Sequence, residues 1–246
     1  AAAAMIREAA PPAGSLVLLP EMFATGFTMN AAAAAEPPGG PVESRLGDLA
    51  AELAVFITAG VVAPDPSGKA RNQAVTFGPD GRPLARYTKI HPFTYGGEHE
   101  HYVAGDEVAL WSWHSLTVSP FICYDLRFPE AFRAATARGA SVLTVIACWP
   151  AARHAHWRAL LRARAIENQA WVVAANRCGA DPKVAYAGGS MVVDPRGEIL
   201  AEAGNRPGVA AAEIDPVEAQ EYRDEFPALR DRRDDLGSRY PAVSAR

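Results

Sequence analysis

The chain alternates between short apolar runs and longer segments in which apolar residues recur every three or four positions. The short runs are often β-branched and are bounded by Gly, Pro or Asp, which is the pattern of strands. Single strands are predicted at Ser15–Leu19, Val55–Ala63, Thr117–Ile122, Ser141–Ala147, Trp171–Asn176 and Val209–Ile214. Two hairpins around turn sequences are predicted from Gln73–Phe77 with Leu84–Thr88 and from Ser190–Asp194 with Glu198–Glu202.

The longer segments have helical spacing. Helices are predicted at Met5–Ala10, from Pro41 to Leu53, at Pro129–Ala137 and at Trp157–Gln169. Because no linker or low-complexity segment divides the series, we expect one domain over residues 1–246. Strands that alternate with helices, together with two hairpins, predict an α/β fold in which two sheets pack face to face with helices outside.

Composition narrows the class of protein. The 246 residues are 49% hydrophobic and carry a formal charge of −4, and the absence of a basic block argues against nucleic acid as a partner. No apolar run approaches the ~18 residues of a membrane span, and the N-terminal residues lack the pattern of a secretory signal. Three cysteines without regular spacing fit a reducing compartment. We therefore expect a cytoplasmic globular protein.

Three reactive side chains follow three apolar runs. Glu21 follows Pro20 at the end of the first run, Lys89 ends the run before His91, and Cys123 follows Ile122. Since strand ends meet at one edge of a sheet, a carboxylate, an ammonium and a thiol are expected to converge there. Together they form the set that acyl transfer requires.

Cys123 stands between a predicted strand and a predicted helix. This placement puts the thiol on a sharp turn near a helix N-terminus, whose dipole favours the thiolate. A buried cysteine can equally be a small core residue. The other two reactive strand ends favour the nucleophile.

The chain resembles the nitrilase superfamily of carbon–nitrogen hydrolases, in its bacterial ω-amidase branch. The similar segments are Pro20–Phe23, Tyr87–Lys89, Cys123–Glu130, Trp149–Arg153, Ala163–Gln169, Asp194–Glu198 and Glu225–Pro227. The resemblance implies a four-layer α-β-β-α sandwich, a homodimer and no cofactor. Relatives also have a strand ahead of the first helix, and this chain begins too late to contain it.

An amide-cleaving role assigns each side chain a task. Cys123 would attack the amide carbonyl and form a thioester, while Glu21 would move the protons. Lys89 and the backbone N–H of Tyr124 would stabilise the oxyanion. The resemblance implies a second glutamate after the lysine motif, and Glu98 fits it better than Glu100. No metal is required.

Other side chains keep alternative interpretations. His99 and His101 with the neighbouring carboxylates could bind zinc if the segment is extended. Cys148 is expected near the site, and Cys178 in an ordinary loop, both without a catalytic role. We expect Arg164 and Glu167 to form an ion pair, with Glu167 also bracing Arg127.

Through the segments Trp149–Arg153 and Ile166–Gln169, the resemblance to ω-amidases implies dicarboxylate monoamides such as α-ketoglutaramate or succinamate as substrates. A related amide such as deaminated glutathione is the alternative, and a catalytically silent binding protein is a third hypothesis. A substrate carboxylate needs a cationic anchor. Candidates for the anchor and the pocket wall are Arg153, Arg177, Phe27, Phe93, Trp149 and Tyr186.

Overall fold

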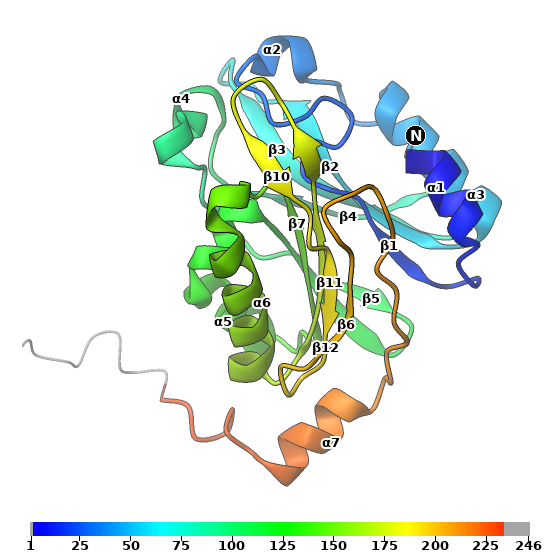
Figure 1. Ribbon diagram of the computed structural model, residues 1–246, viewed down its shortest axis with the longest axis vertical. Helices are drawn as coiled ribbons and strands as arrows, with labels where there is room; N and C mark the ends of the chain where they lie inside the picture. Colours follow the sequence, from blue (N-terminus) through cyan, green and yellow to red (C-terminus); the bar gives the residue numbers. More distant parts are fainter. Residues whose placement is uncertain (1, 234–246) are drawn as a thin grey trace, which may run out of the picture.

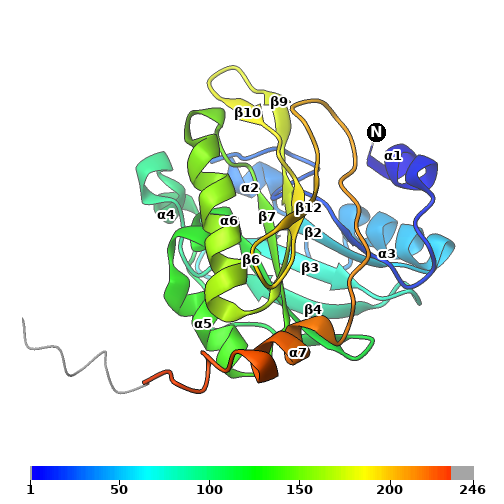
Figure 2. The same ribbon diagram turned by 60° about the horizontal axis from the view of Figure 1, so that its bottom comes forward.

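A computed structural model describes residues 2–233 and shows two β-sheets between two layers of helices (Figure 1, Figure 2). The first sheet has the order β1-β2-β3-β4 and the second the order β12-β11-β8-β7-β6-β5. The first consists of β1 (Leu16–Leu18), β2 (Phe56–Pro64), β3 (Ala70–Phe77) and β4 (Pro83–Thr88). The second consists of β5 (Trp111–Trp113), β6 (Leu116–Ile122), β7 (Val142–Ala147), β8 (Trp171–Asn176), β11 (Met191–Val193) and β12 (Ile199–Glu202).

Helices cover the outer faces of both sheets. On the first sheet lie α1 (Ala2–Ala9) and α3 (Pro41–Leu53), and Ile6, Leu46 and Leu49 share a buried cluster with β2 and β3. On the second lie α5 (Pro129–Ala137) and α6 (His154–Asn168), whose apolar sides share a cluster with β6, β7 and β8. This arrangement confirms the predicted α-β-β-α sandwich.

Apolar side chains from both sheets meet between the two layers. Trp111, Val118 and Trp171 of the second sheet share one cluster with Leu16 and Phe56 of the first. Removal of apolar surface from water is the main force that holds such layers together. The inner cluster therefore fixes one sheet against the other.

Strand direction brings the reactive segments to one place. β1 runs parallel to β2. Because β3 is antiparallel to both β2 and β4, β4 has the same direction as β1 and β2. β6, β7 and β8 are parallel to one another. Side chains that follow β1, β4, β6 and β7 can therefore meet where the carboxyl ends of these strands come together, which is where open α/β sheets build sites.

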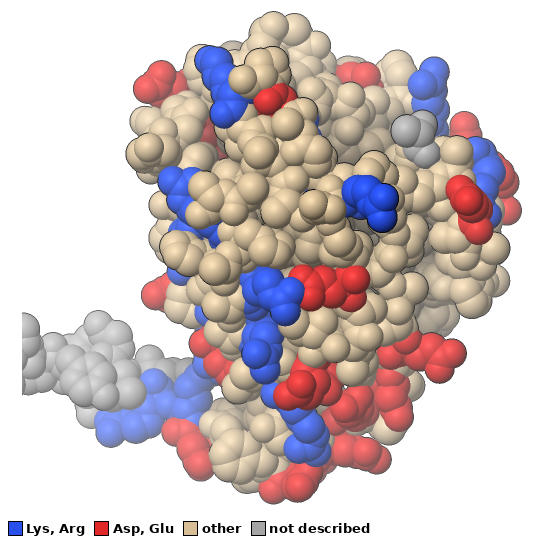
Figure 3. All heavy atoms as spheres, viewed as in Figure 1, with Lys and Arg blue, Asp and Glu red and all other residues tan. Residues whose placement is uncertain are grey.

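Shorter elements complete the described chain. They are α2 (Ala31–Ala34), α4 (Glu98–His101), α7 (Glu218–Glu225), the β9–β10 hairpin (Cys178–Ala180 and Ala185–Ala187), and the 3₁₀ helices η1 (Thr94–Gly96), η2 (Cys123–Arg127) and η3 (Ala151–Arg153). Among residues 2–233, no helix is long and apolar enough to cross a membrane. The face shown in Figure 3 has acidic side chains near α7 and no continuous basic surface.

Two local predictions were wrong. Residues 209–214 form no strand, because they pair with no other segment in the described part of the chain. Their apolar pattern instead places Ile214 against the inner cluster. Cys178, expected in a loop, begins β9, where it pairs with Ala187.

Candidate active site

Glu21 lies in a tight turn directly after β1. Its side chain is fully buried, and the next residue, Met22, has φ 44°. The turn is held against β2 by two hydrogen bonds, from Gly60 N to the Pro20 oxygen and from Phe23 N to the Gly60 oxygen, both 3.2 Å. A Cβ atom at Gly60 would lie 2.5 Å from Glu21 Cα. Glycine at this position thus allows the carboxylate turn to rest on the sheet.

Gly60→Ala is expected to reduce turnover by about 100-fold, because displacing a reacting group by roughly 1 Å has an effect of that order. Steady-state kinetics of the purified variant would measure it. Gly204→Ala is the matched control, since a Cβ there meets no atom within 4 Å. Unchanged turnover in Gly60→Ala would show that the carboxylate position tolerates this shift.

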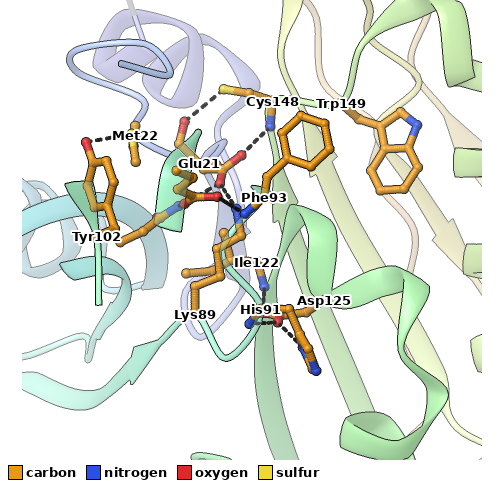
Figure 4. Close-up of polar contacts among 12 residues, drawn as sticks. Glu21, Met22, Lys89, His91, Phe93, Tyr102, Ile122, Asp125, Cys148 and Trp149 are labelled. Atoms are coloured by element: carbon orange, nitrogen blue, oxygen red, sulfur yellow. Dashed lines mark hydrogen bonds and ion pairs between the residues drawn. The ribbon is translucent and has the colours of Figure 1, made fainter. Parts of the chain in front are cut away.

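Lys89 is 1% exposed and binds both glutamates at once. Its Nζ lies 2.8 Å from Glu21 Oε1 and 2.8 Å from Glu98 Oε2 (Figure 4). Burial alone would lower the pKa of Lys89, but the negative charges of Glu21 and Glu98 outweigh it and raise that pKa well above its usual value. The ammonium therefore stays charged, and two of its three protons are used by the glutamates.

Glu98 is buried in the first turn of α4, whereas Glu100 on the same short helix is exposed. Glu98 Oε2 also accepts a 2.5 Å hydrogen bond from Phe93 N. The structure thus brings Glu98, and not Glu100, to the lysine. Because α4 is helical, His99 and His101 do not share one side as the zinc hypothesis assumed, and the described residues contain no group of three or more metal-ligand side chains.

Asn72 of β3 belongs to the same cluster. Its Nδ2 donates to Glu21 Oε1 at 2.7 Å and to Glu98 Oε1 at 2.8 Å, and its backbone oxygen accepts from Lys89 N at 2.9 Å. Asn72 stands just before the predicted strand Gln73–Phe77, whereas β3 begins at Ala70. No motif in the sequence marks it as a site residue.

Cys123 has φ +46°, in the left-handed region that non-glycine residues seldom adopt. It directly follows β6 and begins η2, so the thiol is presented on a sharp turn at the strand end. The residue is partly exposed. Such an unfavourable backbone conformation persists only where the surroundings enforce it, and it is frequent at functional sites.

The surroundings of Cys123 oppose the thiolate that a helix N-terminus was expected to favour. Burial, followed by the negative charge of Glu21, raises the pKa of the thiol well above its ordinary value, although Lys89 acts in the opposite direction. The thiol is therefore neutral at rest, and its nucleophilic attack requires a base.

Asp125 fixes the turn that carries Cys123. This fully buried carboxylate accepts hydrogen bonds from Tyr87 Oη at 2.8 Å and Ile122 N at 3.1 Å. It also accepts from His91 N at 2.9 Å and contacts His91 Nδ1 at 2.8 Å (Figure 4). These partners belong to β4, to the segment after Lys89 and to β6. Asp125 thus joins the thiol turn to the lysine segment, a role that the sequence analysis missed.

Cys148 follows β7 and lies beside Glu21, as expected from the sequence. Its backbone N donates to Glu21 Oε2 at 2.9 Å, and its thiol donates to the Glu21 backbone oxygen at 3.2 Å. Burial is the main cause that raises the pKa of the Cys148 thiol. Cys148 therefore holds the glutamate in place as a neutral donor.

The predicted substrate-binding residues lie around this cluster and differ in how deeply they are buried. The Phe27 ring lies 5.6 Å from Lys89 Nζ. Trp149 is 3% exposed, and its ring packs against Trp157 and under the Arg127 guanidinium, away from Glu21 (Figure 4). The Arg153 guanidinium lies 5.5 Å from the centre of the exposed Tyr95 ring.

The remaining predicted residues have structural contacts. Arg177 lies 4.3 Å from the Tyr186 ring and 3.5 Å from Asp181. Phe93 packs edge to face on Tyr124, and Tyr124 is in the first turn of η2, where backbone N–H groups have no acceptor within the helix.

The expected Arg164–Glu167 ion pair is present at 2.7 Å. The expected contact of Glu167 with Arg127 is wrong, because the Glu167 carboxylate is directed to Arg164 and lies 4.0 Å from Arg133 of the neighbouring α5. Arg127 instead lies over Trp149 and contacts His156.

Comparison with known proteins gives one consistent result. The family model described as carbon-nitrogen hydrolase matches residues 1–224. A 2-oxoglutaramate amidase of Bacillus subtilis is 39% identical, with 90% of this chain and 86% of that protein covered. An ω-amidase YafV of Yersinia enterocolitica is 42% identical, with 88% and 83% covered.

Among solved structures, the CN-hydrolase superfamily protein XC1258 of Xanthomonas campestris superimposes with a TM-score of 0.85 at 35% identity. The alignment covers 94% of this chain and 90% of that one. That protein was solved with an arsenic adduct in its active site. The chain belongs to the carbon–nitrogen hydrolase family, in the ω-amidase-like branch of the nitrilase superfamily.

Proposed function

We propose that this protein hydrolyses the terminal amide of small dicarboxylate monoamides, of the α-ketoglutaramate and succinamate type, to the acid and ammonia. The observation that carries the proposal is the buried cluster of Glu21, Lys89 and Glu98 beside the Cys123 turn. The names of the relatives, 2-oxoglutaramate amidase and ω-amidase, support this substrate class.

The chemistry begins at a neutral thiol. Glu21 takes the Cys123 proton as the sulfur attacks the amide carbon, and the carbonyl oxygen becomes an oxyanion. The third proton of the Lys89 ammonium and the N–H of Tyr124 stabilise that oxyanion. Glu21 then gives its proton to the departing nitrogen, so that ammonia leaves and a thioester remains.

The second half-reaction releases the acid. Glu21, again a carboxylate, takes a proton from the attacking water and later returns it to the Cys123 sulfur. Glu98 keeps a negative charge beside Lys89 throughout, which holds the ammonium in place. A carboxylate that both accepts and donates a proton removes the need for a histidine.

Arg153 is the better anchor for the distal carboxylate of the substrate. Arg177 is already paired with Asp181, whereas within residues 2–233 no carboxylate lies at salt-bridge distance from Arg153. The Arg153 guanidinium instead lies over Tyr95. The Tyr95 ring centre is 5.9 Å from that of Phe93, which packs against Tyr124 next to the nucleophile. A planar guanidinium can bind a carboxylate with two hydrogen bonds.

Ammonia release from α-ketoglutaramate, succinamate, glutamine and deaminated glutathione tests the proposal. We expect the two dicarboxylate monoamides to be cleaved best, and Arg153→Met to raise their KM by about 10-fold or more through loss of a charge-assisted hydrogen bond. Arg177→Met is the matched control. Preferential cleavage of deaminated glutathione would show that the alternative substrate class is the correct one. Absence of ammonia release from all four amides would contradict the proposed activity.

The single domain over residues 1–246, the homodimer and the cytoplasmic location remain predictions. Residues 1 and 234–246 lie outside the described residues. Light scattering on the eluting protein would measure the mass of the assembly, and a monomer at working concentration would contradict the homodimer.

A further inference from the structure

Asn72 is the uncharged member of the buried cluster, and it touches both carboxylates. Asn72 is 1% exposed and lies on β3. Its backbone oxygen accepts a hydrogen bond from Lys89 N. Its amide group is the only part that faces the glutamates, with hydrogen bonds of 2.7 and 2.8 Å. The reverse amide orientation would place an oxygen against two carboxylates, so the electrostatics select this one.

The other end of the amide has no partner. Among the described residues, Asn72 Oδ1 is one of the buried side-chain atoms that accept no hydrogen bond. An unpaired buried polar atom is destabilising, and an apolar side chain of similar size would avoid that cost. The protein thus retains an asparagine for what its Nδ2 does.

The two carboxylate oxygens of Glu21 accept different numbers of hydrogen bonds. Oε1 accepts from both Asn72 Nδ2 and Lys89 Nζ, whereas the one hydrogen-bond donor to Oε2 within residues 2–233 is the Cys148 backbone N–H. A carboxylate oxygen has two lone-pair sites, so Oε1 is saturated and Oε2 retains one. The proton that Glu21 takes from Cys123 must therefore reside on Oε2.

On Glu98 the amide binds the other oxygen. Oε2 accepts from Lys89 Nζ and Phe93 N, whereas Oε1, which does not contact the lysine, accepts from Asn72. One amide thus supplies one donor to each carboxylate. We propose that Asn72 is a positioning residue that, together with Lys89, saturates Oε1 of Glu21 and so directs proton transfer to Oε2. This inference rests on the proposed function.

The titratable groups that face Glu21 come from four segments. They are Lys89 after β4, Glu98 and Tyr102 at the two ends of the α4 segment, Cys123 of η2 and Cys148 after β7. Asn72→Asp keeps the shape of the side chain but places a third carboxyl group against one ammonium. Added negative charge disfavours a thiolate nearby.

The test uses two readouts on Asn72→Asp and Asn72→Leu. The first is the rate of Cys123 alkylation by iodoacetamide as a function of pH, located by peptide mass. In Asn72→Asp, we expect its midpoint to move upward by about one unit or more. The second is steady-state kinetics, in which kcat falls by about 100-fold in both variants, with KM changed by less than about 3-fold because Asn72 does not touch substrate.

Gln73→Leu is the matched control. This buried neighbour on β3 donates to Thr88 Oγ1 of β4 at 2.9 Å and makes no hydrogen bond to Glu21 or Glu98. An alkylation midpoint in Asn72→Asp equal to that of the wild type would overturn the inference, as would a kcat loss no larger than in Gln73→Leu. The alkylation readout needs no substrate. If the proposed amides are not cleaved, it still decides the role of Asn72.

Discussion

Cys123→Ala is expected to lower ammonia release by about 10⁶-fold, to the level of the assay background, because the loss of a covalent nucleophile has an effect of that size. The Cys123 turn is held by Asp125 through backbone and side-chain hydrogen bonds, none of which uses the sulfur. The variant should therefore keep its fold, which a thermal melt would check.

Cys178→Ala is the control for this experiment, since that partly exposed thiol lies in β9 and should tolerate removal. Residual turnover above about 1% of wild type in Cys123→Ala exceeds what oxyanion stabilisation and binding alone leave in such enzymes. That result would move the nucleophile to another group.

Glu21→Gln is expected to lower kcat by about 10³-fold, as is typical for the loss of a general acid–base group. The amide has nearly the shape of the carboxylate but cannot accept the thiol proton. Since the charge of Glu21 raises the pKa of the Cys123 thiol, its removal should lower that pKa. Alkylation of Cys123 should therefore reach its midpoint at a lower pH while turnover falls.

The matched control is Glu43→Gln. Glu43 is also buried and paired, with Arg86 at 2.8 Å, but it lies on α3 away from the thiol. We expect it to lose stability and to keep kcat. Equal loss of kcat in both variants would indicate that Glu21 acts through structure and not through proton transfer.

The sequence predicted most of the fold because the sandwich depends on local patterns. The helix Pro41–Leu53 and the strand Trp171–Asn176 have the predicted bounds, since proline at one end and β-branched residues within the run are strong local signals. Residues 209–214 were misassigned for the opposite reason. An apolar run becomes a strand only if another segment pairs with it, and the residues of the run do not show whether such a segment exists.

The candidate site was predictable where charges follow strands. Glu21, Lys89 and Cys123 stand directly after β1, β4 and β6, so topology alone brings them together. Asn72 and Asp125 were missed because their importance lies in side-chain partners that are 26 to 51 residues away along the chain, which no local pattern reveals.

The protonation state of the Cys123 thiol at rest also could not be predicted from the sequence. A helix N-terminus after Cys123 suggested a thiolate, but the burial of the sulfur and the carboxylate placed next to it decide otherwise. Both effects arise from packing between the two sheets. The same packing places Glu21 beside the sulfur, where it can act as the base that removes the proton from the neutral thiol.

The most direct test of the account is the mass of the protein quenched in acid during turnover of α-ketoglutaramate. A thioester intermediate predicts a fraction of the chain that carries the dicarboxylate acyl group, located by peptide analysis on Cys123 and absent from Cys123→Ala. Turnover without any acylated chain, or an acyl group on Cys148 or Cys178, would contradict the assignment of Cys123 as the nucleophile of this amidase.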